Sequence, residues 1–243
     1  EEIGDYAFYR SGLSEIEFGK NLKKIGRSAF YENWNLKSVS LPAGVTEISD
    51  YAFYGCSSLE RISMPNVEKI GRSSFYGCSS LKNLALPATL KSIGQMAFQD
   101  CFALETLVIP ASVEKIGDFA FLCGDVLTIF SERAEAGENW SRLWNMRNRP
   151  VLWGCTLSAD KTYVVSFTMN DSVENYTAEN GINAPYRAGY TFDGWVSAQK
   201  DYDAKDVYQA PNGTALSALW TEGDPEPDPV PSPTPPPFVE EEE

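Results

Sequence analysis

Histidine is absent from the 243 residues of this chain. Without it, no Ser-His or Cys-His pair can activate a nucleophile, and no imidazole can bind a metal ion. An enzyme built from this sequence would have to rely on carboxylates, lysine, tyrosine or thiols. This absence therefore excludes the commonest catalytic and metal-binding classes.

Basic residues are scarce as well, with 20 Lys and Arg against 34 Asp and Glu, a net charge of -14. Eight of the acidic residues and no basic residue follow Trp220, which leaves about -6 for the rest of the chain. Nucleic acid and anionic lipid both require a basic patch, so we expect neither as a partner. No apolar run approaches the roughly 18 residues that span a bilayer, so we expect no direct membrane insertion.

A six-residue segment, Ile25-Gly26-Arg27-Ser28-Ala29-Phe30, recurs with small changes every 22 or 23 residues. The other copies begin at Ile3, Ile48, Ile70, Ile93 and Ile116. A fixed period of this length predicts a solenoid, in which each unit packs only against its neighbours. The chain starts directly on a repeat, without a signal peptide, so we expect that end to be truncated or processed.

Each unit also contains a strand pattern, Leu-x-x-Ile-x-Leu-Pro, for example over residues 36–42. Alternation places Val39 and Leu41 on one face of the strand and Ser38 and Ser40 on the other. Proline then ends the strand because it cannot donate to the ladder. The same pattern begins at Leu59, Leu81 and Leu104, and a copy without the proline begins at Leu13.

Stacking of the units is expected to align equivalent apolar side chains into ladders, because one unit cannot bury its apolar face alone. The expected ladders are Ile25-Ile48-Ile70-Ile93-Ile116, Phe30-Phe53-Phe75-Phe98-Phe121 and Leu36-Leu59-Leu81-Leu104. Strand neighbours lie about 4.8 Å apart, so the stack should form a parallel sheet. The repeated phenylalanines are therefore interpreted as core residues.

These two half-units resemble the BspA-like leucine-rich repeat, a bacterial class, over about residues 1–130. The resemblance implies an α/β-type solenoid, a right-handed leucine-rich repeat superhelix with short parallel strands. It also implies a closing cap at about 129–155, so we assign residues 1–155 to the repeat domain. Trp140 and Trp144, four residues apart and beside Leu143, would form one helical turn of an apolar lid over the last repeat.

The cysteines show the same periodicity. Cys56, Cys78 and Cys101 occupy one slot of successive units, Cys123 falls within one residue of it, and Cys155 stands apart. Stacking would bring the first four within disulfide reach. Ladder side chains point in parallel, however, and a line of ligands does not form the tetrahedron that zinc prefers. We therefore interpret them as reduced structural thiols, with a disulfide or a zinc site as the alternatives.

The period is lost after Cys155, where short strand patterns at residues 162–168, 185–195 and 215–220 indicate a small β-rich module. Gly189-Tyr190-Thr191-Phe192-Asp193-Gly194-Trp195 and Ala218-Leu219-Trp220 resemble the Listeria–Bacteroides repeat, or internalin-type B repeat, over about 160–220. The resemblance implies a β-grasp-like spacer or adhesive module. Met169-Asn170-Asp171-Ser172 replaces the usual Asn-Gly-Gly turn. Trp195 and Tyr190 are expected in the core rather than stacked on carbohydrate.

The last segment, residues 221–243, contains eight prolines and ends in four glutamates. It cannot bury apolar surface, so we expect an extended, disordered Pro/Glu-rich linker. A Pro-x-x-Pro ligand for an SH3-type domain is the alternative, and a stalk fits a surface protein better.

Together these features predict a non-enzymatic binding or adhesion protein, extracellular or on the bacterial cell surface. The partner would be a protein of a host or neighbouring cell, of its surface or matrix, or a glycan. We expect a monomer without cofactor, metal or catalytic residue. The ligand-binding candidates are the polar strand residues not needed by the core: Glu15, Glu17, Ser38, Ser40, Arg61, Ser63, Asn83 and Thr106.

Two other functions remain open at this point. The chain would be a structural spacer or assembly element if the sheet face is merely solvated, and its single arginine and lack of aromatics favour that interpretation. A glycan-active enzyme would need two carboxylates about 5–10 Å apart, which Glu15 and Glu17 could supply.

Overall fold

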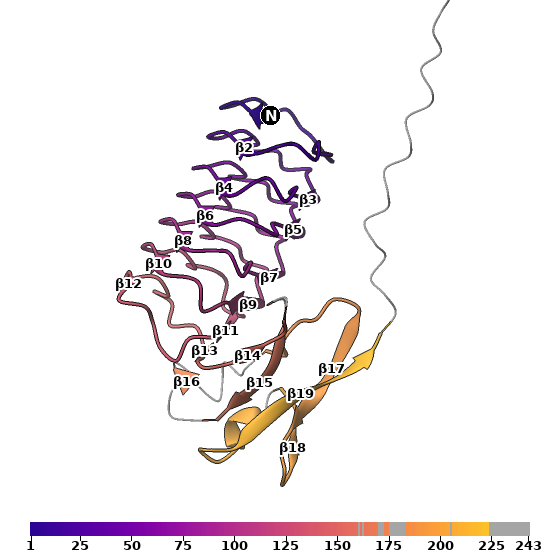
Figure 1. Ribbon diagram of the computed structural model, residues 1–243, viewed down its shortest axis with the longest axis vertical. Coiled ribbons are helices and arrows are strands. Elements are labelled where there is room, and N and C mark those ends of the chain that lie inside the picture. The colour runs from indigo at the N-terminus through magenta and orange to yellow at the C-terminus, as the bar shows by residue number, and fades with distance from the viewer. Residues whose placement is uncertain (160, 162, 170–172, 175–182, 205, 224–243) are drawn as a thin grey trace, which may run out of the picture.

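The computed structural model describes residues 1–159, 161, 163–169, 173–174, 183–204 and 206–223. It is a stack of coils that runs from the N-terminus into a second β-rich part (Figure 1). The predicted linker from residue 224 onward and the loop at 170–172 lie outside the described residues.

One side of the stack is a parallel sheet with one two-residue strand per coil, which we call the isoleucine sheet. Each strand ends with the isoleucine that begins the six-residue repeat, or with Trp140 in the last coil. The strands are β1 (Glu2–Ile3), β2 (Lys24–Ile25), β4 (Glu47–Ile48), β6 (Lys69–Ile70), β8 (Ser92–Ile93), β10 (Lys115–Ile116) and β12 (Asn139–Trp140). The sequence predicted the isoleucine ladder but not this sheet.

The other side is built by the predicted strand pattern, and we call it the leucine sheet. Its parallel strands form two ladders that are not hydrogen-bonded to each other: β3 (Ser38–Ser40) pairs with β5 (Arg61–Ser63), and β7 (Asn83–Ala85), β9 (Thr106–Ile109), β11 (Thr128–Ser131) and β13 (Val151–Leu152) pair in that order. β16 (Val173–Glu174) pairs antiparallel with β13. The strand predicted in the first unit, at residues 13–18, is not formed.

No α-helix occurs among residues 1–155, all of which the structure describes, so the α component of the predicted α/β solenoid is wrong. Tight turns connect the two sheets instead. In each turn the residue two positions after the repeat glycine, or after Ser49 in the third unit, has a positive φ. These residues are Tyr6, Ser28, Tyr51, Ser73, Met96 and Phe119. The repeat region is therefore a parallel β-solenoid.

The predicted ladders are confirmed. Ile25, Ile48, Ile70, Ile93 and Ile116 are paired in register, and all are buried. The five predicted phenylalanines stack with ring centroids 5.1–5.4 Å apart, and Phe8 extends the row. Leu36, Leu59, Leu81 and Leu104 have no exposed surface. Burial of these side chains, at about 1.5–3 kcal/mol each, is the main favourable contribution to the stability of the stack.

The repeat glycine is required by the approach of neighbouring coils. A Cβ on Gly71 would lie 2.6 Å from the backbone nitrogen of Asp50, too close for any side chain. The third unit has Ser49 at this position, and its hydroxyl donates to the carbonyl oxygen of Ile25 at 2.6 Å. Coils can therefore stack only when this position is glycine or a small residue that bonds to the coil before it.

The last coil is closed by three tryptophans. Trp140 lies on β12, Trp144 in the turn that follows and Trp153 after β13, and their rings lie 5.0–6.2 Å apart. All three are buried, so the predicted lid is present. The helical turn predicted for it is not, because Trp140 is extended and pairs with Ile116. Leu143 is 40% exposed and lies outside the lid.

The second β-rich part is an antiparallel sheet, which we call the C-terminal sheet. In spatial order its strands are β14 (Thr156–Leu157), β15 (Val164–Thr168), β19 (Ala215–Glu222), β17 (Tyr190–Val196) and β18 (Asp201–Tyr202). A 3-10 helix, η1 (Val207–Gln209), precedes β19. None of the described helices has the length and apolar character needed to cross a membrane.

The two aromatic residues expected in the core of this part behave differently. Trp195 is fully buried, 4.7 Å from the ring of Phe167, as predicted. Tyr190 is 37% exposed, and its ring lies 3.4 Å from the guanidinium carbon of Arg187. The core prediction was therefore wrong for Tyr190, because its position on β17 turns the ring towards solvent and Arg187.

Candidate binding surface

Six of the candidate residues lie on the outer face of the leucine sheet, in two rows that follow the repeat. The first row is Ser38, Arg61, Asn83, Thr106 and Thr128, and the second is Ser40, Ser63, Ala85, Val108, Phe130 and Leu152; strand pairing aligns each row within β3–β5 and within β7–β13, and the repeat alone relates the two parts. The alternating residues Val39, Leu84 and Leu107 point inward and are buried in the solenoid core. The predicted alternation of the two faces is confirmed for β3.

The face is open over β3 and β5, and we call this part the open half. Ser38, Ser40, Arg61 and Ser63 are all exposed there. Their short side chains leave a flat, polar surface around one guanidinium group. Such a surface fits a large partner better than a small molecule, which needs a concave site.

The face is covered over β9, β11 and β13, and we call this part the covered half. Val108, Phe130 and Leu152 are 4%, 0% and 0% exposed. They share one apolar cluster with residues of the C-terminal sheet, among them Phe167 and Trp195. The C-terminal sheet is therefore packed on the solenoid.

Polar contacts secure the same junction along the first row. The backbone N–H of Asn183 donates to the Thr128 hydroxyl at 3.0 Å. The Asn183 side-chain amide donates to the carbonyl oxygens of Glu105, at 3.2 Å, and Val126. One residue from the segment before β17 therefore bonds to the backbone of two successive coils.

This packing changes the candidate set. Thr106 is 4% exposed and donates its hydroxyl to the side-chain oxygen of Asn83 at 2.7 Å. Asn83 is half-buried beside it. The expectation that Thr106 faces solvent was wrong, since its strand lies in the covered half. Asn83 marks the border between the two halves.

Glu15 and Glu17 belong to the first unit, which forms no strand there, and both are exposed. They lie in the same segment as Leu13 and Ile16, whose side chains are partly buried against the core. The two carboxylates therefore lie beside the open half rather than within its paired rows.

The cysteines have a structural role in the turns. The Cys56 thiol donates to the carbonyl oxygen of Phe30 at 3.3 Å, and Cys78, Cys101 and Cys123 do the same to the phenylalanine carbonyl of the coil before them. All five cysteines are unpaired and buried. Burial raises the pKa of the Cys56 and Cys123 thiols to about 12. Because thiolate is the nucleophile and metal ligand, such thiols are unreactive at neutral pH.

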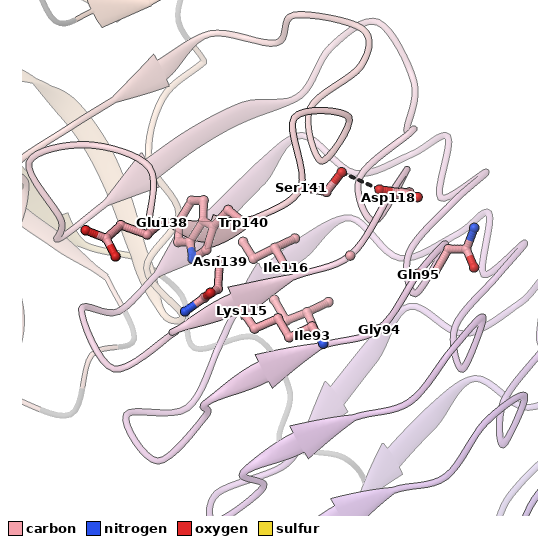
Figure 2. A pocket seen from close by; sticks show the side chains of 11 residues that line it. Ile93, Gly94, Gln95, Lys115, Ile116, Asp118, Glu138, Asn139, Trp140 and Ser141 are labelled. Atoms are coloured by element: carbon pink, nitrogen blue, oxygen red, sulfur yellow. Dashed lines mark hydrogen bonds between the residues drawn. The ribbon is translucent and has the colours of Figure 1, made fainter.

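A shallow hollow of about 450 Å³ lies on the isoleucine sheet over β8, β10 and β12 (Figure 2). Lys115, Glu138 and Trp140 contribute to its lining. Asp118, also in the lining, accepts a hydrogen bond from the Ser141 hydroxyl (Figure 2). Within the described residues, no group of three or more acidic or thiol side chains is arranged to hold a metal ion.

The covered half was detectable in the sequence. All four residues of β9 are buried, and so are all four of β11. A strand buried on both faces has a continuous apolar run, as in Leu107-Val108-Ile109, instead of strict alternation. In contrast, β3 has the exposed, buried, exposed pattern of a strand with one solvated face.

Residues 1–124 match the BspA type leucine-rich repeat region in six copies. The chain therefore belongs to the BspA-type leucine-rich repeat family, as its repeat pattern indicated. No curated protein matches it.

Several solved structures are similar to the chain. A leucine-rich repeat protein from Bacteroides ovatus is 34% identical over 53% of this chain and 34% of its own, with a TM-score of 0.48. A leucine-rich repeat protein from T. pallidum is 37% identical over 43% and 50%, with a TM-score of 0.41. A leucine-rich cell surface protein from Faecalibacterium prausnitzii is 27% identical over 57% and 45%, with a TM-score of 0.46. The chain thus spans a third to a half of the length of these proteins.

Proposed function

We propose that this chain is a non-enzymatic binding protein displayed on or secreted from a bacterial cell. It recognises a protein or glycan ligand through the open half of the leucine sheet. Ser38, Ser40, Arg61 and Ser63 contact the ligand, with Asn83, Glu15 and Glu17 at the margin. Membership of the BspA-type family supports the surface location, because one similar protein is described as a cell surface protein.

One observation carries this proposal: the outer side of the stack is open over the two-stranded ladder of β3 and β5 and covered over β9, β11 and β13 of the neighbouring ladder. The C-terminal sheet occupies the apolar part of the face and leaves the polar part exposed. A flat surface rich in serine keeps its hydrogen-bonding groups in water until a partner of complementary shape replaces that water. The open half is thus the part of the face at which a macromolecule can bind.

The chain is organised around this face as a repeat domain (1–155), a module of the Listeria–Bacteroides type with a β-grasp-like fold (about 160–220, with its last strand extending to Glu222) and a linker, expected from residue 221, that can begin only after that strand. The module covers the apolar rows and spaces the binding face from what lies beyond. Five strands in one antiparallel sheet support the assignment of a β-rich module.

The proposal is tested by screening the full chain against matrix proteins and glycan arrays. The full chain is needed because a 1–155 fragment would expose Val108, Phe130 and Leu152, and these would bind non-specifically. The variant Ser38→Glu/Arg61→Glu/Ser63→Glu introduces like charges at the centre of the open half. We expect it to weaken binding by about 10-fold or more, since central interface residues carry most of the affinity.

A matched control is Lys24→Glu/Lys115→Glu, which adds the same negative charge on β2 and β10 of the isoleucine sheet. It should leave binding unchanged. Equal losses in the two variants would show an unspecific effect of net charge and refute the open half as the site.

A structural spacer is the second candidate function. It is favoured by the composition of the open half, where Arg61 is accompanied only by small polar residues. A full chain that binds nothing in the screen yet keeps its two parts rigidly packed would support this function.

A further inference from the structure

A second ladder of aromatic residues lies outside the core, one position after the phenylalanines. Tyr9, Tyr31, Tyr54 and Tyr76 stack with ring centroids 4.8, 4.6 and 4.8 Å apart and interplanar angles of 13°, 1° and 7°. The next two units have Gln99 and Leu122 at this position. The tyrosine ladder therefore covers the first four units only.

The rings of this ladder lie face to face, so a partner can reach their edges and not the faces between them. Tyr9 is 41% exposed, and the other three are half-buried. Tyr6 and Tyr51 lie beside the ladder, 6.0 Å from Tyr9 and 6.1 Å from Tyr54. The result is an aromatic strip with a row of hydroxyls, set apart from the leucine sheet.

A row of charges accompanies the strip. Asp5, Arg27, Asp50 and Arg72 occupy one position of successive units, and all are exposed. The carboxylates are held in place because Asp5 accepts the N–H of Arg27 at 2.8 Å and Asp50 accepts that of Arg72 at 2.7 Å. The row adjoins the aromatic strip, since the Arg27 guanidinium lies 5.4 Å from the centre of the Tyr51 ring.

We propose that this surface, the tyrosine ladder with its charged row, binds the same surface of a second copy in an antiparallel two-fold dimer. The charges alternate as minus, plus, minus, plus along the first four units. Reversal by a two-fold axis between the second and third units places each aspartate of one copy opposite an arginine of the other. The same axis passes between Tyr31 and Tyr54, so the two ladders also coincide.

A second copy fits this surface better than a glycan does. Sugars stack on the faces of aromatic rings, and here each face is covered by the next ring. A second copy presents a ladder of the same 4.6–4.8 Å spacing, so Tyr31 of one copy lies opposite Tyr54 of the other and their hydroxyls can pair at the two-fold axis, while the Tyr76 hydroxyl is bonded to Asp100. Tyrosine and arginine are also the side chains most enriched at the centres of protein interfaces.

The dimer is weak, because four units make a short interface. Three spacings of about 4.8 Å make the contact only about 14 Å long along the stack. Its area is therefore well below that of a standard interface, which buries roughly 800 Å² per partner. We expect a dissociation constant on the order of 10–100 µM, typical of small transient interfaces. The monomer predicted from the sequence is then the dilute form, and the dimer forms at the high local concentration of a surface.

Sedimentation velocity of the full chain between about 1 and 500 µM tests the proposal, because this range brackets the expected dissociation constant. The sedimentation coefficient should rise from monomer to dimer. Arg27→Glu/Arg72→Glu, which makes the row entirely negative, should weaken the dimer by at least about 10-fold. The control Lys24→Glu/Lys115→Glu adds the same charge on the isoleucine sheet and should dimerise normally.

A complementary variant makes the test decisive. Asp5→Lys/Asp50→Lys makes the row entirely positive and should be monomeric alone, yet form a heterodimer when mixed with Arg27→Glu/Arg72→Glu. Circular dichroism checks that each variant is folded. If a charge variant does not fold, Tyr31→Phe/Tyr54→Phe takes its place, because it removes the hydroxyls at the two-fold axis and should also weaken the dimer. A chain that stays monomeric at 500 µM (about 5-fold above the upper limit of the expected constant), or an Arg27→Glu/Arg72→Glu variant that dimerises like the control, overturns the proposal.

Discussion

The outer face of the leucine sheet has an open half over β3 and β5 and a covered half over β9, β11 and β13. Strands pair in parallel within each half and the same inward-facing leucine ladder runs behind both, although no strand pairing joins β5 to β7. They differ in the second outward row, which changes from Ser40 and Ser63 through Ala85 to Val108, Phe130 and Leu152. Within one repeat architecture, the outward residues alone decide whether a strand faces water or another sheet.

This difference shows how a solenoid acquires a second layer without changing its coil. Each inward ladder must stay apolar because the coils stack through it. Outward positions are free to change, and a few apolar ones create a surface that must be covered. The C-terminal sheet covers it, and its loss should affect the two halves very differently.

The largest effect is expected from truncation after residue 155. Exposure of Val108, Phe130 and Leu152 should cost roughly 5–9 kcal/mol, at about 1.5–3 kcal/mol for each side chain. The fragment should bind a hydrophobic dye and aggregate, whereas the full chain should do neither. Dye fluorescence and sedimentation measure this. A monodisperse fragment with no dye binding would show that the covered half tolerates water.

A single substitution makes the same comparison within one row. Phe130→Ala removes a fully buried ring from the junction and should lower the free energy of unfolding by about 3–5 kcal/mol. Ser40→Ala occupies the same row on exposed β3 and should change it by no more than about 0.5 kcal/mol. Urea denaturation of both variants checks the contrast. Similar losses would mean that the row is not divided as described.

Much of the solenoid was predictable because its ladders depend on local periodicity. Ile25, Phe30 and Leu36 recur at fixed spacing, and only stacking in register buries every copy. The isoleucine sheet was missed because each strand has two residues, too few for alternation to be visible. The lid was recognised from Trp140 and Trp144, yet its extended backbone is set by pairing with β10, which spacing within the segment does not reveal.

The division of the candidate face depends on contacts distant in sequence. Thr106 looks like Ser38 when each strand is considered alone, and only the apolar run beside it indicates burial on both faces. The partner of that run includes Trp195 and Phe167, and Asn183 adds bonds to Glu105. No pattern in the sequence relates these segments. For the same reason, the tyrosine ladder becomes meaningful only when its rings are seen to stack outside the core.

Thiol labelling should distinguish the two halves by their rates of local opening. Burial raises the pKa of Cys56 to about 12 and that of Cys155 as well, so neither reacts in the closed state at pH 8. Cys56 belongs to the coil of β5, which has only solvent on its outer side, whereas Cys155 packs with the C-terminal sheet. We expect iodoacetamide to label Cys56 at least about 10-fold faster, because opening there breaks fewer contacts.

The control for this labelling is Cys56→Ser, which should remove the fast labelling of residue 56 and leave the slower labelling of Cys155 unchanged. Mass spectrometry of peptides assigns each site. Earlier labelling of Cys155 would reverse the proposed order of stability and show that the junction opens before the solenoid does.

The smallest effect concerns Tyr76, in the unit whose strand β7 borders the two halves. A hydrogen bond to Asp100, followed by burial, raises the pKa of Tyr76 from 10.0 to about 12. The folded state therefore holds this proton more tightly than the unfolded state. The contribution is complete below pH 10 and is lost as the pH rises towards 12. Above pH 10, the free energy of unfolding should fall less steeply with pH in Tyr76→Phe than in the unmodified chain. The two should differ by under about 1 kcal/mol, which urea denaturation at each pH measures. Identical slopes would show that this hydrogen bond does not stabilise the border unit.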